Sequence, residues 1–159
     1  MFLIIGGCIA LVAIGIVVIS LLFGIFEGVE NADYYKFGDD QVPSIKLVLG
    51  EVRSITGSES SASSGQFIRR YTYRIDSQIH GSDQVEDDLS RYTGHLMRYE
   101  GFYLTEERSA SSTYRGGYRV SYAKESVEPG KIIILDIDYS TTAYTLVFTK
   151  TEGTLTIFR

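Results

Sequence analysis

The first 26 residues contain no charged side chain, and this constrains the chain more than any other feature. As a helix they would extend about 37 Å, whereas the hydrocarbon core of a bilayer is about 30 Å thick. We therefore expect residues 1–26 to form a transmembrane anchor helix. A cleaved signal peptide is the main alternative, but its apolar region is shorter, about 7–15 residues, and follows a basic start that is missing here. An acylation site at Cys8 is a third interpretation, although no apolar region precedes it.

The charges beside this helix predict its orientation only weakly. No Lys or Arg precedes it, and the residues that follow are acidic with Lys36 as the exception. The positive-inside rule counts Lys and Arg, so it has little to act on. The short uncharged start and the acidic far flank favour a single-pass protein of the cell membrane, in contact with lipid. We expect a cytoplasmic N-terminus and an extracytoplasmic C-terminal domain.

Small residues recur along the apolar segment at heptad spacing, with Val17 interrupting the series. Within lipid, helices associate through close packing at small residues, because no hydrophobic effect drives them together. We expect this stripe to pack against a second copy of the chain or against a partner membrane protein. The alternative is that Gly and Ala are simply common in membrane helices. The predicted helix-packing residues are Gly6, Ala10, Ala13, Ser20 and Gly24.

The rest of the chain divides into residues 27–42, expected as an acidic juxtamembrane linker, and residues 43–159, expected as one soluble domain. The domain is long enough for one core and too short for two. A net charge of −5 argues against nucleic acid as a partner, since such proteins present a basic face.

Alternating apolar residues predict an antiparallel sheet of about seven strands in this domain. A phase slip at Gly50 suggests a β-bulge in the first strand, and the serine-rich residues 57–65 suggest a loop after it. The expected strands are 43–56, 66–76, 102–111, 114–126, 131–139, 143–150 and 154–158.

One amphipathic helix is predicted over residues 83–100. Asp83 and Glu86 have capping-box spacing, and Gly101 suits the left-handed residue that ends a helix. A single apolar stripe indicates that the helix packs on one face of the sheet, which makes the fold class α+β. The stripe consists of Val85, Leu89, Tyr92, Leu96 and Tyr99.

Residues able to carry chemistry are few. His80 and His95 lack partners at metal-ligand spacing, and no nucleophile or phosphate-loop motif is present. Asp136 and Asp138 share one face of a strand, where two carboxylates could bind Ca²⁺ or act as acid and base. The polar face of an amphipathic strand explains them more simply. We expect no metal, no cofactor and no enzymatic activity.

The chain has 12 tyrosines, many of them beside arginine on predicted strands. Tyrosine favours strands in any case, but exposed Tyr and Arg are also typical of binding surfaces. The possible binding face consists of Arg70, Arg74, Tyr114, Arg115, Tyr118 and Arg119.

These features predict a membrane-anchored protein whose domain serves binding or scaffolding, as an accessory subunit of a membrane or surface assembly. The first alternative is a pilin-like filament subunit with the apolar helices bundled in its core. The second alternative is a surface-anchored hydrolase that uses Asp136, Asp138 or a histidine.

Overall fold

The computed structural model describes residues 32–63, 65–76 and 83–155. The predicted anchor at 1–26, its five helix-packing residues and His80 lie outside these ranges. Within the described ranges, no helix is both long enough and apolar enough to cross a membrane.

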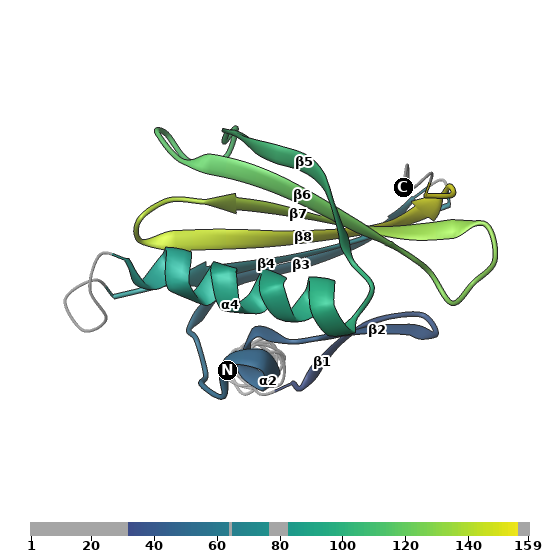
Figure 1. Cartoon of the computed structure of the whole chain (residues 1–159), viewed down its shortest axis with the longest axis horizontal. Coiled ribbons are helices and arrows are strands. Elements are labelled where there is room, and N and C mark those ends of the chain that lie inside the picture. Colours follow the sequence, from purple (N-terminus) through teal and green to yellow (C-terminus); the bar gives the residue numbers. More distant parts are fainter. Residues whose placement is uncertain (1–31, 64, 77–82, 156–159) are drawn as a thin grey trace, which may run out of the picture.

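Most of the described chain forms one antiparallel sheet of six strands in the order β3-β4-β8-β7-β6-β5 (Figure 1). Two further strands, β1 (Tyr34–Phe37) and β2 (Asp40–Pro43), pair only with each other. The helices within the described ranges are α2 (Ile45–Leu49) and α4 (Gln84–Tyr99). The six strands are β3 (Ile55–Ser63), β4 (Gln66–Arg74), β5 (Tyr103–Ala110), β6 (Tyr118–Glu125), β7 (Lys131–Tyr139) and β8 (Ala143–Glu152).

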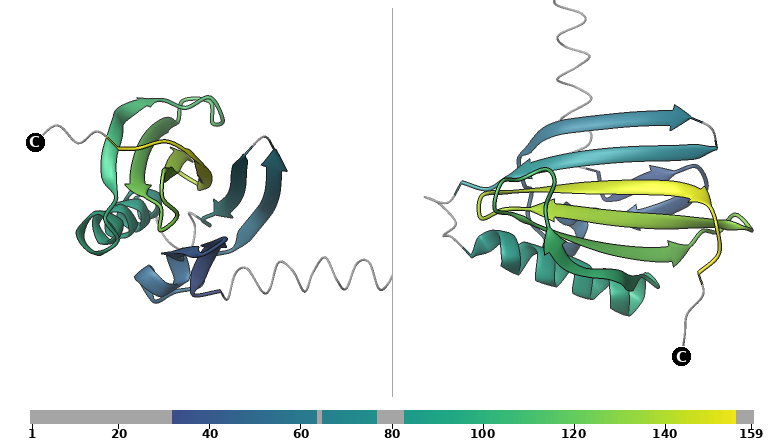
Figure 2. Two further views of the ribbon diagram at one scale, coloured as in Figure 1. Left: turned by 90° about the vertical axis from the view of Figure 1, so that its right-hand side faces the viewer. Right: turned by 90° about the horizontal axis from the view of Figure 1, so that it is seen from above.

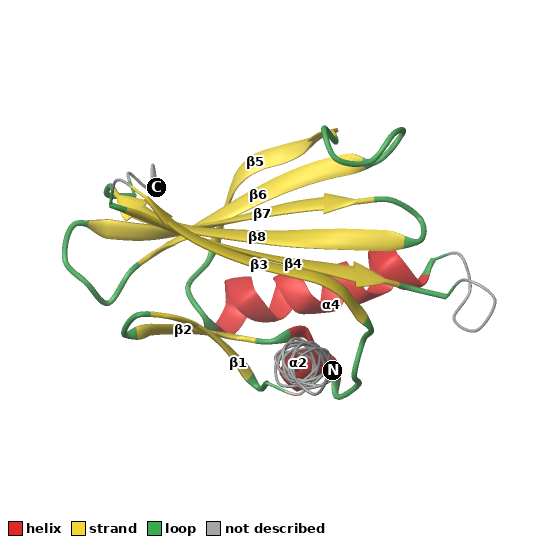
Figure 3. Ribbon diagram, turned by 180° about the vertical axis from the view of Figure 1, so that it is seen from behind, coloured by secondary structure: helices red, strands yellow, loops and turns green. Residues whose placement is uncertain are grey.

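Among the described residues, the helices cover one face of the sheet, and the other face is open except where Ser111 and Tyr114 of the β5–β6 loop lie on it. Helix α4 crosses the covered face, with α2 and the β1–β2 hairpin beside it on the same side (Figures 1 and 3). Figure 2 shows the strong twist of the sheet over this layer, as expected for long antiparallel strands. The hydrophobic core lies between the two layers and is rich in aromatic residues such as Tyr35, Tyr92 and Phe148.

The predicted fold, a single sheet of about seven strands with one helix, is wrong. Residues 45–49 were expected in the first strand but form helix α2 instead. The Ser44 hydroxyl accepts a hydrogen bond from the Leu47 N–H at 3.2 Å, and Gly50 ends the helix at a φ of 74°. Ile45 and Leu49 are buried, and Leu47 between them is exposed. The two buried residues are four apart, which is the spacing of a helix. In so short a segment, Ile45, Leu47 and Leu49 fit the alternation of a strand equally well.

The first strand of the sheet comes from the segment expected to be a loop. Residues Ser58 to Ser63 pair regularly with β4, after an irregularity between Ile55 and Gly57. Backbone hydrogen bonds to a neighbouring strand hold this serine-rich segment extended, and its side chains are mostly exposed. Strands β1 and β2 likewise arise where a linker was expected, and bring Tyr35 and Phe37 into the core.

Helix α4 begins and ends within one residue of the prediction. Its expected stripe is buried at Val85, Leu89, Tyr92 and Leu96, but Tyr99 is exposed. Asp83 makes no side-chain capping bond, so the predicted capping box is wrong. The predicted ending is confirmed, because Gly101 has a φ of 72° and the next residue's N–H donates to the Leu96 carbonyl at 3.3 Å.

Four tyrosines on adjacent strands form a row across the covered face. Tyr118 pairs with Tyr139, Tyr139 with Tyr144, and Tyr144 with Tyr73. The rings of Tyr73 and Tyr144 stack at 5.0 Å between centroids, and those of Tyr118 and Tyr139 lie 5.8 Å apart. The row runs from the buried centre of the sheet to Tyr118, which is exposed.

Candidate functional site

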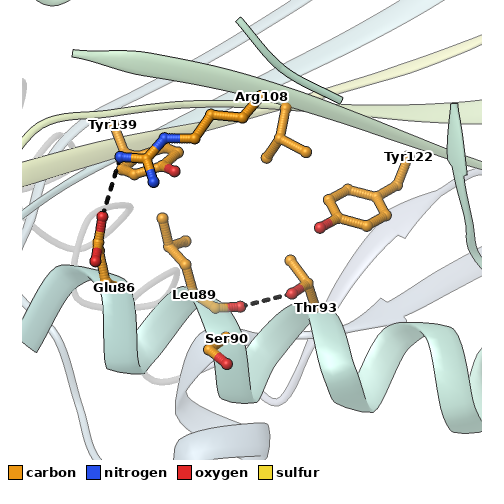
Figure 4. Close-up of a pocket in the computed structure, with 8 residues that line it drawn as sticks. Glu86, Leu89, Ser90, Thr93, Arg108, Tyr122 and Tyr139 are labelled. Carbon is orange, nitrogen blue, oxygen red and sulfur yellow. Dashed lines mark hydrogen bonds and ion pairs between the residues drawn. The ribbon is translucent and has the colours of Figure 1, made fainter. Parts of the chain in front are cut away.

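A groove lies between the N-terminal half of α4 and strands β5 to β7 (Figure 4). Its volume is about 210 Å³. A second hollow of about 180 Å³ shares Glu86 and Tyr139 with the first and extends it toward Tyr118. We call the two together the α4–β6 groove. The first hollow is lined by Glu86, Leu89, Ser90, Thr93, Arg108, Val120, Tyr122 and Tyr139.

Arg108 lies at the mouth of the groove, between a ring and a carboxylate. Its guanidinium carbon is 3.4 Å from the ring centroid of Tyr118 and 5.5 Å from that of Tyr139. One nitrogen, Nη2, donates to Glu86 Oε1 at 3.2 Å. Both side chains are about half exposed, at 48% and 63%. Such a pair contributes about 0–1 kcal/mol, so solvent or a ligand can replace it at little cost.

The floor of the groove is apolar but contains two tyrosine hydroxyls. Burial raises the pKa of the Tyr139 hydroxyl, against the opposing effect of Arg108. Tyr122 is only 8% exposed. Its hydroxyl points into the groove (Figure 4) and has no hydrogen-bond partner among the described residues.

The polar rim of the groove is supplied by α4. Thr93 donates its hydroxyl proton to the Leu89 carbonyl at 2.8 Å, a bond within the helix. Ser90, one turn from Glu86, is exposed at the same rim. The groove therefore combines an apolar floor, an unpaired hydroxyl and one exchangeable ion pair.

The structure does not bring the six residues of the predicted binding face onto one surface. Tyr118 lies on the covered face beside Arg108. The other five lie on the open face or in the β5–β6 loop, most of them paired. Arg70 contacts Glu59 at 3.4 Å, Arg119 contacts Asp136 at 2.9 Å, and the Tyr114 hydroxyl hydrogen-bonds Thr145 at 2.8 Å. Arg74 and Arg115 are exposed.

The candidate catalytic residues are also separated. Asp136 and Asp138 each accept a hydrogen bond of 2.6 Å, from Ser121 and from Ser111. Both lie on the open face, whereas His95 is on α4 and faces Glu100 at 3.9 Å. Within the described ranges, no three His, Cys, Asp or Glu residues converge where they could hold a metal ion.

Sequence reasoning missed Arg108, Tyr122 and Glu86 as one cluster. Tyr118 and Tyr122 stand at alternate positions of one strand, a spacing that places both side chains on the same face. Arg108 reaches that face across a pairing with register shifts between Leu104 and Glu106 and between Glu106 and Ser109. Because such shifts change which side chains meet, the pattern of β5 does not predict the contact.

The chain matches no protein-family model, no curated protein and no solved structure. Its function is therefore inferred from geometry and chemistry.

Proposed function

We propose that this chain is a membrane-anchored binding protein, an accessory subunit of a membrane or surface assembly. The uncharged residues 1–26 hold it in the membrane, and the C-terminal domain lies outside the cytoplasm. The domain binds a segment of a partner protein in the α4–β6 groove. The observation that carries this proposal is the apolar groove, whose wall presents the hydroxyl of Tyr122 without a hydrogen-bond partner among the described residues.

The size of the groove favours a protein segment over a small molecule. Pockets for drug-sized ligands have volumes of about 300–1,000 Å³ and enclose most of the ligand. The two hollows, at about 210 and 180 Å³, each lie below this range and together reach only its lower end, so each suits one or two side chains of a ligand. Their lining also suits a protein, since Tyr and Arg are enriched where proteins bind one another. Tyr118, Tyr122, Tyr139 and Arg108 supply both residue types.

The test compares complexes extracted from native membranes in mild detergent after light cross-linking. Ser90→Trp places a large side chain on the rim of the groove, and Ser61→Trp makes the same change at an exposed position of β3. We expect wild type and Ser61→Trp to carry a second chain at fixed stoichiometry, and Ser90→Trp to lose it. An unchanged complex in Ser90→Trp, or a bare monomer in wild type, would overturn the proposal.

Attachment to the membrane is tested separately. We expect the full chain to stay with the membrane pellet after an alkaline carbonate wash, which releases peripheral proteins. Recovery of the chain in the supernatant would contradict the anchor.

A further inference from the structure

We infer that the groove recognises a peptide segment with a carboxylate beside an apolar side chain, and that this carboxylate replaces Glu86 on Arg108. This inference rests on the proposed function and specifies its ligand.

Arg108 is held in position to bind a carboxylate, and its present partner, Glu86, accepts only one of the hydrogen bonds that its guanidinium can donate. A guanidinium has five N–H donors in a planar fork that binds a carboxylate through two parallel hydrogen bonds. Glu86 takes one bond through a single oxygen, Oε1, at 3.2 Å. The Tyr118 ring, 3.4 Å from the guanidinium carbon, restrains the plane of the fork. An incoming carboxylate that binds through both oxygens is therefore favoured over Glu86.

The ligand carboxylate displaces Glu86 from Arg108. It lies in the first turn of α4, its side chain is 63% exposed, and Arg108 is its only ion-pair or hydrogen-bond partner among the described residues. Released into solvent, its carboxylate remains favourable near the positive end of the helix dipole. A basic ligand on Glu86 would instead bring its charge close to Arg108, which the Tyr118 ring holds in place.

The remainder of the groove accepts the neighbouring part of the ligand. Leu89 and Val120 offer apolar contacts beside Arg108. The Tyr122 hydroxyl points into the groove and has no hydrogen-bond partner among the described residues, so it is able to donate to an acceptor of the ligand. A backbone carbonyl of the peptide provides that acceptor, and an apolar side chain next to the carboxylate covers the apolar floor.

The test uses a displayed library of random heptapeptides, selected on the full chain in lipid nanodiscs. We expect enriched peptides to contain Asp or Glu next to Leu, Ile, Phe or Met. Arg108→Gln should weaken their binding by about tenfold, which corresponds to the loss of one charge-assisted contact. Glu86→Gln should strengthen binding, since it removes the competing carboxylate. Tyr122→Phe should weaken it by a smaller factor.

The open face offers a matched control, because Arg70 and Glu59 form an ion pair of similar length and exposure. Arg70→Gln and Glu59→Gln should leave binding within about twofold of wild type, as expected for distant independent sites. Enrichment of basic or uncharged peptides, the absence of any enriched sequence, or equal binding to Arg108→Gln would overturn the inference. Weaker binding to Glu86→Gln would also overturn it.

The two proposals fail in different ways. If Ser90→Trp loses the native complex but the selected peptides lack a carboxylate, the groove binds a partner of other chemistry. If Ser90→Trp keeps the complex, the groove is not the binding site, and the proposed function falls with the inference.

Discussion

Arg53 and Asp88 form a buried, bidentate ion pair. Arg53 Nε lies 2.7 Å from Asp88 Oδ2, and Arg53 Nη2 lies 2.9 Å from Oδ1. The two side chains are 5% and 0% exposed. The hydrogen bond that Arg53 donates to Asp88 is the main cause of the raised pKa of Arg53, and burial acts to lower this pKa. Because Arg53 follows α2 and Asp88 lies in α4, the pair joins the two helices of the covering layer.

Removal of Asp88 should strongly destabilise the fold. Asp88→Ala leaves the Arg53 charge buried with only Glu51 as a partner, at 2.6 Å. The loss of one member of a buried pair costs about 3–5 kcal/mol. Asp87→Ala, at the next residue, breaks only an exposed contact of 3.8 Å to Arg91 and should cost less than about 1 kcal/mol. Urea unfolding of both variants measures the difference, and equal costs would contradict this role.

A second buried pair makes stability depend on acid pH. Lys150 contacts Asp40 at 2.7 Å and also pairs with Glu128. Burial would raise the pKa of Asp40, but hydrogen bonds from Lys150, Ser126 and the Val127 N–H outweigh it. The pKa of Asp40 therefore falls below its ordinary value of 3.8. The unfolded chain then binds a proton more readily than the folded one, so protonation of Asp40 favours unfolding.

We therefore expect the free energy of unfolding to fall as pH drops below about 4, through the lowered pKa of Asp40. Asp40→Asn should be less stable than wild type at neutral pH and should show a shallower acid slope. Asp39→Asn, at the exposed neighbouring residue, should keep wild-type stability at neutral pH. Thermal unfolding at several pH values measures these slopes, and an unchanged slope in Asp40→Asn would refute the assignment.

Two buried tyrosines should respond in opposite ways to loss of the hydroxyl group. The Tyr144 hydroxyl is buried without a hydrogen-bond partner in the described structure, whereas that of Tyr92 donates to the Pro43 carbonyl at 2.9 Å. Tyr144→Phe removes an unsatisfied group and should leave stability unchanged or raise it by up to about 1 kcal/mol. Tyr92→Phe leaves a carbonyl unpaired and should cost about 1–3 kcal/mol. Equal losses in the two variants, measured by urea unfolding, would show that Tyr144 has a partner in solution.

Two glycines provide a similar contrast. A Cβ at Gly117 would lie 2.3 Å from the Tyr139 carbonyl oxygen, whereas a Cβ at Gly94 in α4 meets nothing within 4 Å. Gly117→Ala forces a backbone shift and should cost about 1–3 kcal/mol. Gly94→Ala should stabilise the domain by about 0.5–1 kcal/mol, because Ala is the better helix former. Melting temperatures of the two variants should therefore move in opposite directions from that of wild type.

The sequence predicts the parts of the fold that have long, regular patterns. Strands β4, β7 and β8 and helix α4 each carry enough apolar residues to define their period. Helix α2 has five residues, too few for its period to differ clearly from alternation. Strand β3 has polar side chains throughout most of its length, so pairing with β4 rather than its own pattern makes it a strand.

The site was less predictable than the fold. Asp88 follows two exposed acidic residues, and its spacing from Val85 and Tyr92 puts it on the buried face of the helix, but only the structure shows Arg53 as its partner. Likewise Arg108 differs from the other arginines through its contact with Tyr118, which depends on the irregular register of β5. Contacts set by tertiary geometry leave no periodic trace in a single sequence.

The strand order has a consequence for how the domain is made. Strand β8 lies between β4 and β7, so it joins the earlier hairpin to the later strands. During synthesis, β4 emerges from the ribosome about 70–80 residues before its partner β8, with Tyr71 and Tyr73 still lacking their neighbours. The nascent domain therefore remains open, with apolar surface exposed, until β8 is translated. Strand β8 therefore completes the sheet, because among the described strands it is the one that pairs with both β4 and β7.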